Sequence, residues 1–217
     1  MKAASRKDDN QFARGRQDLR KIFHIMIGMF GFLYPFMDWE MILFSWIVAM
    51  FCAWFISSRA DAFENLLSPS ERRLGYSPAM ISYALVMVIA SLIFRDQMKD
   101  SALILLSALA FGDGFSALIG MSYPGTKIPY NRKKSIGGSL AFIFFGTIGA
   151  LFMLFFLFSF MMHKTAPIEV STFPVFRVLI VMTICAIVET IPWRIPDNIP
   201  IGIAGIIALL ATMKLYR

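Results

Sequence analysis

Asp113 is the residue of this sequence whose surroundings most clearly suggest chemistry. It stands between Gly112 and Gly114, after ten uncharged and mostly apolar residues, 102–111, and more uncharged residues follow it. An ionised carboxylate in such a segment costs about 2.5–3.5 kcal/mol on membrane-insertion scales. A structural hydrogen bond to a neighbouring helix is the simpler explanation, but the cost favours a functional role.

Other polar residues join Asp113 on one side if the chain crosses a membrane with its N-terminus in the cytosol. A basic loop, 127–135, follows Asp113, Glu189 lies near the cytosolic end of a later apolar segment, and Asp197 comes in the next short turn. Mg²⁺ favours carboxylate oxygens together with phosphates, and phosphates favour Lys, Arg and backbone N–H groups. The loop alone is typical of a topology signal, so the prediction of a metal and polyphosphate site depends on co-location.

The composition requires that these residues be positioned by membrane helices. Of the 217 residues, 58% are hydrophobic and only 16% are charged, against about 25% charged residues in soluble domains. The sequence lacks the alternation of barrel strands, so the predicted fold is all-α, a polytopic transmembrane helical bundle. About seven spans are expected, at 22–37, 40–58, 77–94, 101–122, 136–162, 173–192 and 199–216.

The loop charges predict the orientation. With the N-terminus in the cytosol, 15 of the 21 Lys and Arg residues fall in cytosolic segments, as the positive-inside rule requires. Residues 1–21 are then a basic cytosolic segment, and 22–217 a single transmembrane catalytic domain. The first segment fits neither a cleavable signal nor a transit peptide, so the first apolar run is expected to stay as a transmembrane helix. A bacterial or archaeal cytoplasmic membrane is favoured. The net charge of +7 reflects topology, and no nucleic-acid partner is expected.

Two nucleotide-binding patterns are incomplete. Residues 112–117 match G-x-G-x-x-A, but a membrane helix precedes them where a strand is required. Residues 120–127 nearly match a P-loop, but Thr126 stands where the lysine belongs. Cys52 and Cys185 lie in apolar runs and indicate neither a disulfide framework nor a metal site.

The segments Gly112-Asp-Gly-Phe-Ser-Ala-Leu-Ile-Gly120 and Gly125-Thr-Lys-Ile-Pro-Tyr-Asn-Arg-Lys-Lys-Ser-Ile-Gly-Gly-Ser139 strongly resemble the phytol kinase and dolichol kinase family. Weaker matches flank them in the expected order, Arg20-Lys21-Ile-Phe-His24 and Glu189-Thr-Ile-Pro192 with its following Asp-Asn pair. Many relatives have Glu where this chain has Gly137, whereas the phytol kinase branch tends to a small residue there. The segment after the Asp-Asn pair is also shorter than usual.

The resemblance implies a polytopic enzyme that transfers the terminal phosphate of CTP to an isoprenoid alcohol on the cytosolic face, with Mg²⁺ as cofactor. Phytol, farnesol, geranylgeraniol and polyprenols all fit, and membrane lipids surround the protein. Asp113 would hold the metal, and Glu189 or Asp197 would complete the metal shell or take the hydroxyl proton. Nucleotide or phosphate contacts are expected from Gly112, Gly114, Lys127, Lys133, Lys134, Ser135, Gly137, Gly138, Ser139 and Asn198, with Arg20, Lys21 and His24 as further candidates.

Two alternative functions stay open from the sequence. A cytidylyltransferase would form a CDP-lipid instead, although the long signature of those enzymes is absent. A proton- or ion-coupled transporter would also use intramembrane carboxylates such as Asp113 and Glu189, but it would require polar residues in the far halves of the same spans, which are almost wholly apolar. The sequence leaves the alcohol, the nucleotide base and the oligomeric state undetermined.

Overall fold

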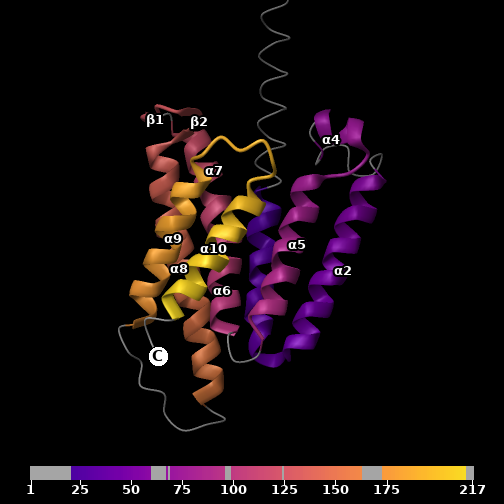
Figure 1. Ribbon diagram of the computed structural model, residues 1–217, viewed down its shortest axis with the longest axis vertical. Coiled ribbons are helices and arrows are strands. Elements are labelled where there is room, and N and C mark those ends of the chain that lie inside the picture. Colours follow the sequence, from indigo (N-terminus) through magenta and orange to yellow (C-terminus); the bar gives the residue numbers. More distant parts are fainter. Residues whose placement is uncertain are drawn as a thin grey trace, which may run out of the picture.

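The computed structural model describes residues 21–59, 67, 69–95, 99–123, 125–162 and 173–213. Within these ranges the chain forms an almost entirely helical bundle (Figure 1). The elements are a first helix, Lys21–Phe36, whose second half is the 3₁₀ segment η1 (Met29–Phe36), then α2 (Trp39–Ser58), α4 (Pro69–Leu74), α5 (Pro78–Ile93), α6 (Lys99–Ser107), the π-helical turn η3 (Ala108–Gly112), α7 (Asp113–Ser122), α8 (Ile136–Met162), α9 (Phe173–Glu189) and α10 (Asn198–Met213).

The predicted all-α bundle is confirmed, and each of the seven expected segments contains a helix. Three helices are long and apolar enough to cross a membrane, Trp39–Ser58, Lys99–Ser122 and Ile136–Phe160. The other apolar helices are shorter, such as Pro78–Ile93 and Asn198–Met213. The number of spans and the orientation in the membrane stay predictions.

The segment Lys99–Ser122 lies at the centre of the bundle. In its most apolar stretch, 72% of the residues are buried, against 22% for α2 and 44% for Ile136–Phe160. By contrast, α2 and α8 carry large exposed apolar side chains, among them Phe51 and Phe155, which suit contact with lipid. The carboxylate-bearing segment is therefore enclosed by the other helices.

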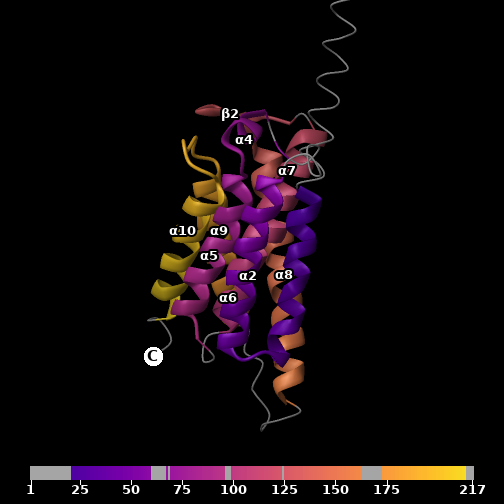
Figure 2. The same cartoon turned by 90° about the vertical axis from the view of Figure 1, so that its right-hand side faces the viewer.

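One end of the bundle collects the polar connections. A short antiparallel hairpin of β1 (Lys127–Ile128) and β2 (Asn131–Ser135) lies there with α4, the start of α8 and the end of α9 (Figures 1 and 2). We expected a basic loop at 127–135, and the structure forms a hairpin that leads directly into α8. Its lysines are thus carried by a defined strand.

The opposite end has a polar network of its own. Arg177 in α9 donates to Asp100 Oδ2 at 2.5 Å and to Ser101 Oγ at 2.7 Å. Lys99 Nζ donates to the carbonyl oxygen of Met37 at 2.8 Å. Because these bonds join α6 to α9 and to the turn before α2, they stabilise the end of the bundle that lies away from the hairpin.

Close packing holds α8 against the central segment. The Ser107 hydroxyl donates to the carbonyl oxygen of Gly146 at 2.8 Å. A Cβ at Gly149 would lie 2.2 Å from Phe111 and 2.8 Å from the Ser107 hydroxyl. Only glycine permits this approach of α8 to η3, which small residues commonly provide between membrane helices.

Gly149→Ala should therefore lower stability by about 1–3 kcal/mol, because the added methyl group overpacks a closed contact. Gly137→Ala in the first turn of the same helix is the matched control, since a Cβ there meets no atom within 4 Å. Thermal unfolding in detergent measures both variants. Equal unfolding midpoints would contradict the packing role of Gly149.

Candidate functional site

A cavity of about 510 Å³ lies at the hairpin end of the bundle. This volume is within the range of small-molecule sites. The first helix, α5, α7, the hairpin, the start of α8 and the segment 189–198 all contribute to its wall. The lining residues are Lys21, His24, Ala79, Asp113, Ser116, Ala117, Gly120, Met121, Lys133, Lys134, Ser135, Gly138, Glu189, Asp197 and Asn198.

A π-helical turn positions Asp113 at this cavity. The Asp113 N–H points back to the carbonyl oxygens of Ala108 and Ala110, so the backbone holds one five-residue step between α6 and α7. Such turns are frequent at functional sites because they change which side chains share a helix face. Ser116 and Gly120 then follow Asp113 at helical spacing along the cavity wall.

The Asp113 carboxylate is buried and only partly paired. Its residue is 1% exposed, and its Oδ2 atom forms an ion pair with Lys21 Nζ across the cavity. Its Oδ1 atom is buried without a hydrogen-bond partner among the described residues. Because an unpaired buried carboxylate oxygen is costly, Oδ1 is an atom to which a ligand can bind favourably.

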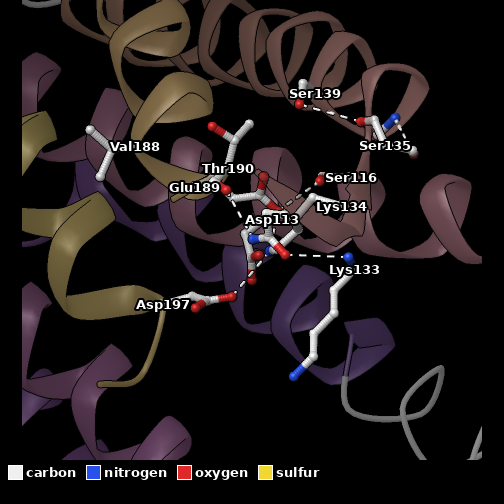
Figure 3. Close-up of polar contacts among 12 residues, drawn as sticks. Asp113, Ser116, Lys133, Lys134, Ser135, Ser139, Val188, Glu189, Thr190 and Asp197 are labelled. Carbon is white, nitrogen blue, oxygen red and sulfur yellow. Dashed lines mark hydrogen bonds and ion pairs between the residues drawn. The ribbon is translucent and has the colours of Figure 1, made fainter. Parts of the chain in front are cut away.

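Glu189, 2% exposed at the end of α9, repeats this arrangement (Figure 3). Its Oε1 atom accepts from Ser116 Oγ at 3.1 Å and pairs with Lys134 Nζ. Its Oε2 atom is buried with no partner in the described part of the chain. Lys134 also reaches Asp197 Oδ2 at 3.1 Å, so one ammonium group bridges two carboxylates.

Local sequence fixes the position of Glu189. The helix α9 ends at Glu189. It cannot continue far beyond this residue, because Pro192 disfavours helical backbone at Ile191. The Thr190 hydroxyl closes the last turn by donating to the carbonyl oxygen of Ile187 at 2.6 Å. The Asn131 amide then donates to the Thr190 carbonyl oxygen at 2.9 Å, which joins the hairpin to this helix end.

Lys134 remains charged in this setting. Burial alone would lower its pKa, but the carboxylates of Glu189, Asp113 and Asp197 outweigh that effect and raise the pKa well above the ordinary lysine value. The side chain therefore presents a permanent positive charge to the cavity at neutral pH.

The remaining basic-loop residues divide between the cavity and the surface. Lys133 lines the cavity, although its side chain extends away from the carboxylates (Figure 3). Ser135 is buried, and its hydroxyl accepts from the Gly138 N–H at 3.1 Å, which caps α8. That N–H, expected to face phosphate, is therefore already bonded. Lys127, Gly137 and Ser139 are not among the residues that line the cavity.

The two glycines beside Asp113 serve helix packing. A Cβ at Gly112 would lie 2.7 Å from Phe142, and one at Gly114 would lie 2.6 Å from Ile25. Neither glycine lines the cavity. Neighbouring helices approach closely at both positions, and the nucleotide contacts expected there stay predictions.

The outer motifs also meet at the cavity. Lys21 and His24 line it, and the His24 ring stacks on Tyr83 with centroids 5.0 Å apart. Asn198 lines it too, but its amide donates to the Ala79 carbonyl oxygen at 2.7 Å and so joins α10 to α5. Arg20 lies outside the described residues.

Comparison with known proteins finds relatives whose names agree with one another. A probable phytol kinase 1 from Glycine max is 32% identical over 124 residues, covering 56% of this chain and 39% of the relative. Phytol kinase 1 from Arabidopsis thaliana is 28% identical over 150 residues, covering 66% and 48%. A farnesol kinase from the same plant is 26% identical over 128 residues, covering 58% and 40%. All three are chloroplastic proteins.

The chain is thus similar, over more than half of its own length, to curated phytol and farnesol kinases, which supports the resemblance to the phytol kinase / polyprenol kinase family. The chain spans less than half the length of each of these relatives. No family model and no solved structure matches it.

The geometry gives roles to three residues of the quoted motif segments for which the sequence predicted none. Ser116, Asn131 and Thr190 bond to the carboxylate cluster or support it. Ser116 has a recognisable signal, because a residue three positions after Asp113 shares its helix face. Asn131 and Thr190 also lie in the quoted segments, but the sequence does not indicate that they bond to each other, since 59 residues separate them.

The magnesium cofactor expected from the sequence stays a prediction. Among the described residues, no group of three His, Cys, Asp or Glu side chains is placed to hold a metal ion. The unpaired Asp113 Oδ1 and Glu189 Oε2 atoms do fit a Mg²⁺ ion held by one or two carboxylates together with substrate phosphates. These donors suit a metal ion that arrives with its phosphate ligands better than a resident metal centre.

Lys134→Gln should destabilise the protein by about 3 kcal/mol near neutral pH, because it leaves Glu189 buried without its counter-charge. Since the pKa of Lys134 is raised in the folded state, the wild-type advantage should be constant up to about pH 10. It should shrink above about pH 10.4, the ordinary lysine value, as the pH rises toward the folded pKa.

The measurement is the unfolding midpoint across this pH range, compared among wild type, Lys134→Gln and the neighbouring control Lys133→Gln. The control should shift little at any pH. A Lys134→Gln difference that already disappears between pH 7 and 9 would contradict the ion-pair assignment.

Proposed function

We propose that the protein is a membrane lipid kinase that transfers the terminal phosphate of a nucleoside triphosphate, with CTP favoured, to an isoprenoid alcohol. The observation that carries the proposal is the cavity in which two buried carboxylates, Asp113 and Glu189, each keep one oxygen unpaired beside the ammonium groups of Lys21 and Lys134. The names of the relatives, phytol kinases and a farnesol kinase, support this reaction class.

The charges suit a polyphosphate. Phosphoryl transfer needs mainly positioning and neutralisation of developing negative charge. Lys21 approaches from the first helix and Lys134 from the hairpin, so cations stand on two walls of the cavity. Lys133 adds a third cation at the wall. The N-terminal ends of α8 and α10 lie beside the cavity. Each carries the positive end of its helix dipole, which favours an anion.

The two unpaired oxygens can divide the remaining roles. Asp113 Oδ1 would bind a nucleotide-bound Mg²⁺ ion, which when present neutralises the phosphates. Glu189 Oε2 would accept the hydroxyl proton as the alcohol oxygen forms its bond to phosphorus and the nucleoside diphosphate leaves. Asp197, whose side chain is 43% exposed, would hold Lys134 from the other side.

The lipid substrate fits the position of the cavity. It lies at the end of helices whose outer faces are apolar, so an isoprenoid chain could lie along the bundle while its hydroxyl reaches the carboxylates. The wall near Asp113 includes small or apolar side chains, Ala79, Ala117 and Met121, which leave room for an unbranched hydroxymethyl end.

The arrangement argues against an ion pathway. Between the cavity and the Arg177 network at the far end, the central segment contributes buried apolar side chains such as Leu103, Leu106 and Leu109. Ser107 lies among them, but its hydroxyl is bonded to Gly146. A transporter would need polar groups along this route.

Asp113→Asn should reduce phosphorylation of an isoprenoid alcohol by at least about 100-fold while the protein still folds, because an amide is a poor metal ligand and leaves Lys21 unpaired. Asp38→Asn, an exposed carboxylate at the opposite end, is the matched control and should keep full activity. The assay follows label from a nucleoside triphosphate into lipid. Retention of about a tenth or more of wild-type turnover at saturating Mg²⁺ would remove Asp113 from the proposed site.

The proposed site should face the cytosol, because nucleoside triphosphates are cytosolic and cannot cross the bilayer unaided. Sealed inside-out vesicles should phosphorylate an added lipid alcohol, and right-side-out vesicles should do so only after permeabilisation. In a background without Cys52 and Cys185, an impermeant thiol reagent applied to intact cells should label Asp38→Cys and spare Arg132→Cys. Labelling of position 132 alone would show that the topology is the reverse of the predicted one.

A further inference from the structure

Two hydrogen bonds join the hairpin to the end of α9, and the three residues that form them have no proposed catalytic role. The Asn131 amide Nδ2 donates to the Thr190 carbonyl oxygen at 2.9 Å. The Tyr130 and Thr190 hydroxyls share a hydrogen bond of 2.7 Å. Asn131 and Thr190 are both buried, whereas most of the Tyr130 ring is exposed. We call Tyr130, Asn131 and Thr190 the hairpin clamp.

Asn131 is the central member of the clamp because its side chain bonds in two directions. While Nδ2 reaches across to α9, Oδ1 accepts from the Lys133 N–H at 3.3 Å and shapes the strand that carries the lysines. The hairpin pairs only through Lys127–Ser135 and Ile128–Asn131. A ribbon this short is not stable in isolation, so its position depends on what it docks against.

The clamp joins the two backbone segments that carry the partners of the buried ion pair. Thr190 follows Glu189 directly, and Lys134 comes three residues after Asn131 on the same strand. Fixing the hairpin to Thr190 therefore fixes the base of the Lys134 side chain relative to Glu189. A lysine side chain is long and flexible, and ordering it upon ligand binding costs affinity.

We propose that the hairpin clamp positions Lys134 for the polyphosphate, with Asn131 as the principal positioning residue. The inference rests on the proposed function, since it takes the nucleotide as the ligand of Lys134. Loss of the clamp should weaken nucleotide binding while use of the lipid alcohol is unchanged, because none of the three residues lines the cavity.

Asn131→Asp tests the clamp with almost no change of shape. The variant keeps the oxygen that accepts from Lys133, loses the donor to Thr190, and places a carboxylate oxygen against the Thr190 carbonyl oxygen. Affinity for a non-hydrolysable CTP analogue, measured on purified protein with Mg²⁺, should fall about 10-fold. The apparent KM for the alcohol should stay within about twofold of wild type.

Tyr130→Phe removes only one hydroxyl and should weaken analogue binding by about two- to fivefold. The matched control is Tyr123→Phe, which removes a hydroxyl from a tyrosine that is 72% exposed after α7 and should bind like wild type. Thr190→Ser keeps both the backbone acceptor and a hydroxyl, so it should bind the analogue with near-wild-type affinity. Thr190→Val loses the hydroxyl that bonds Tyr130 and should bind more weakly.

A double-mutant cycle separates positioning of Lys134 from general damage to the fold. In a Lys134→Ala background, adding Asn131→Asp should cause no further loss of analogue affinity, because the residue it positions is gone. Two independent and additive losses would overturn the proposal, as would an equal rise in the apparent KM for both substrates.

Limited trypsin digestion in detergent gives a readout that needs no activity. The exposed Arg132 and Lys133 bonds should be cut several-fold faster in Asn131→Asp than in wild type or Tyr123→Phe, since the hairpin is released. Unchanged cleavage would overturn the clamp itself. If the wild-type protein binds the analogue but phosphorylates no alcohol, the proposed function is rejected and the positioning role of the clamp is not. If the wild-type protein does not bind the analogue, both are rejected.

Discussion

The structure depends on the cost of holding carboxylates inside an apolar helical bundle. Asp113 and Glu189 are almost fully buried, and an isolated charge in such surroundings would be strongly unfavourable. Each is compensated by a lysine from outside its own helix, Lys21 for Asp113 and Lys134 for Glu189. Both lysines can enter because the pairs lie at the end of the bundle, where the backbone leaves the apolar core.

The placement of the other elements follows from this requirement. The central segment must carry Asp113 to the cavity, so it is the most enclosed of the three long helices. The π-helical turn places Asp113 and Ser116 on the cavity wall, and Phe111 of that turn packs on Gly149 of α8. The hairpin must hold Lys134 over Glu189, and bonds to the end of α9 keep it there. Each carboxylate nevertheless retains one unpaired oxygen, which gives the cavity its capacity for a ligand.

The helices and the principal charged residues could be predicted from the sequence, because their signals are local. An apolar run of membrane length is visible in any window, and a carboxylate within one stands out because it is costly. The partners could not be predicted in the same way. Lys21 and Asp113 are 92 residues apart, and Lys134 and Glu189 are 55 apart, so their pairing follows only from tertiary packing. The packing of Gly112 against Phe142 and of Gly114 against Ile25 also follows only from tertiary structure, since a glycine permits close approach of a helix as readily as of a ligand. The hairpin is too short to show strand periodicity, and neither Asn131 nor Thr190 has a chemical type that indicates a role.

We propose that the paired lysines and carboxylates form a site for transfer of the terminal phosphate of a nucleotide to a lipid hydroxyl. The most direct test is to incubate the purified protein with phytol or farnesol and CTP that carries its label at either the γ or the α phosphorus. The γ label should appear in a lipid monophosphate, and the α label should stay in CDP. Transfer of the α label to the lipid with release of pyrophosphate would show that the protein transfers a cytidylyl group, and it would contradict a kinase reaction.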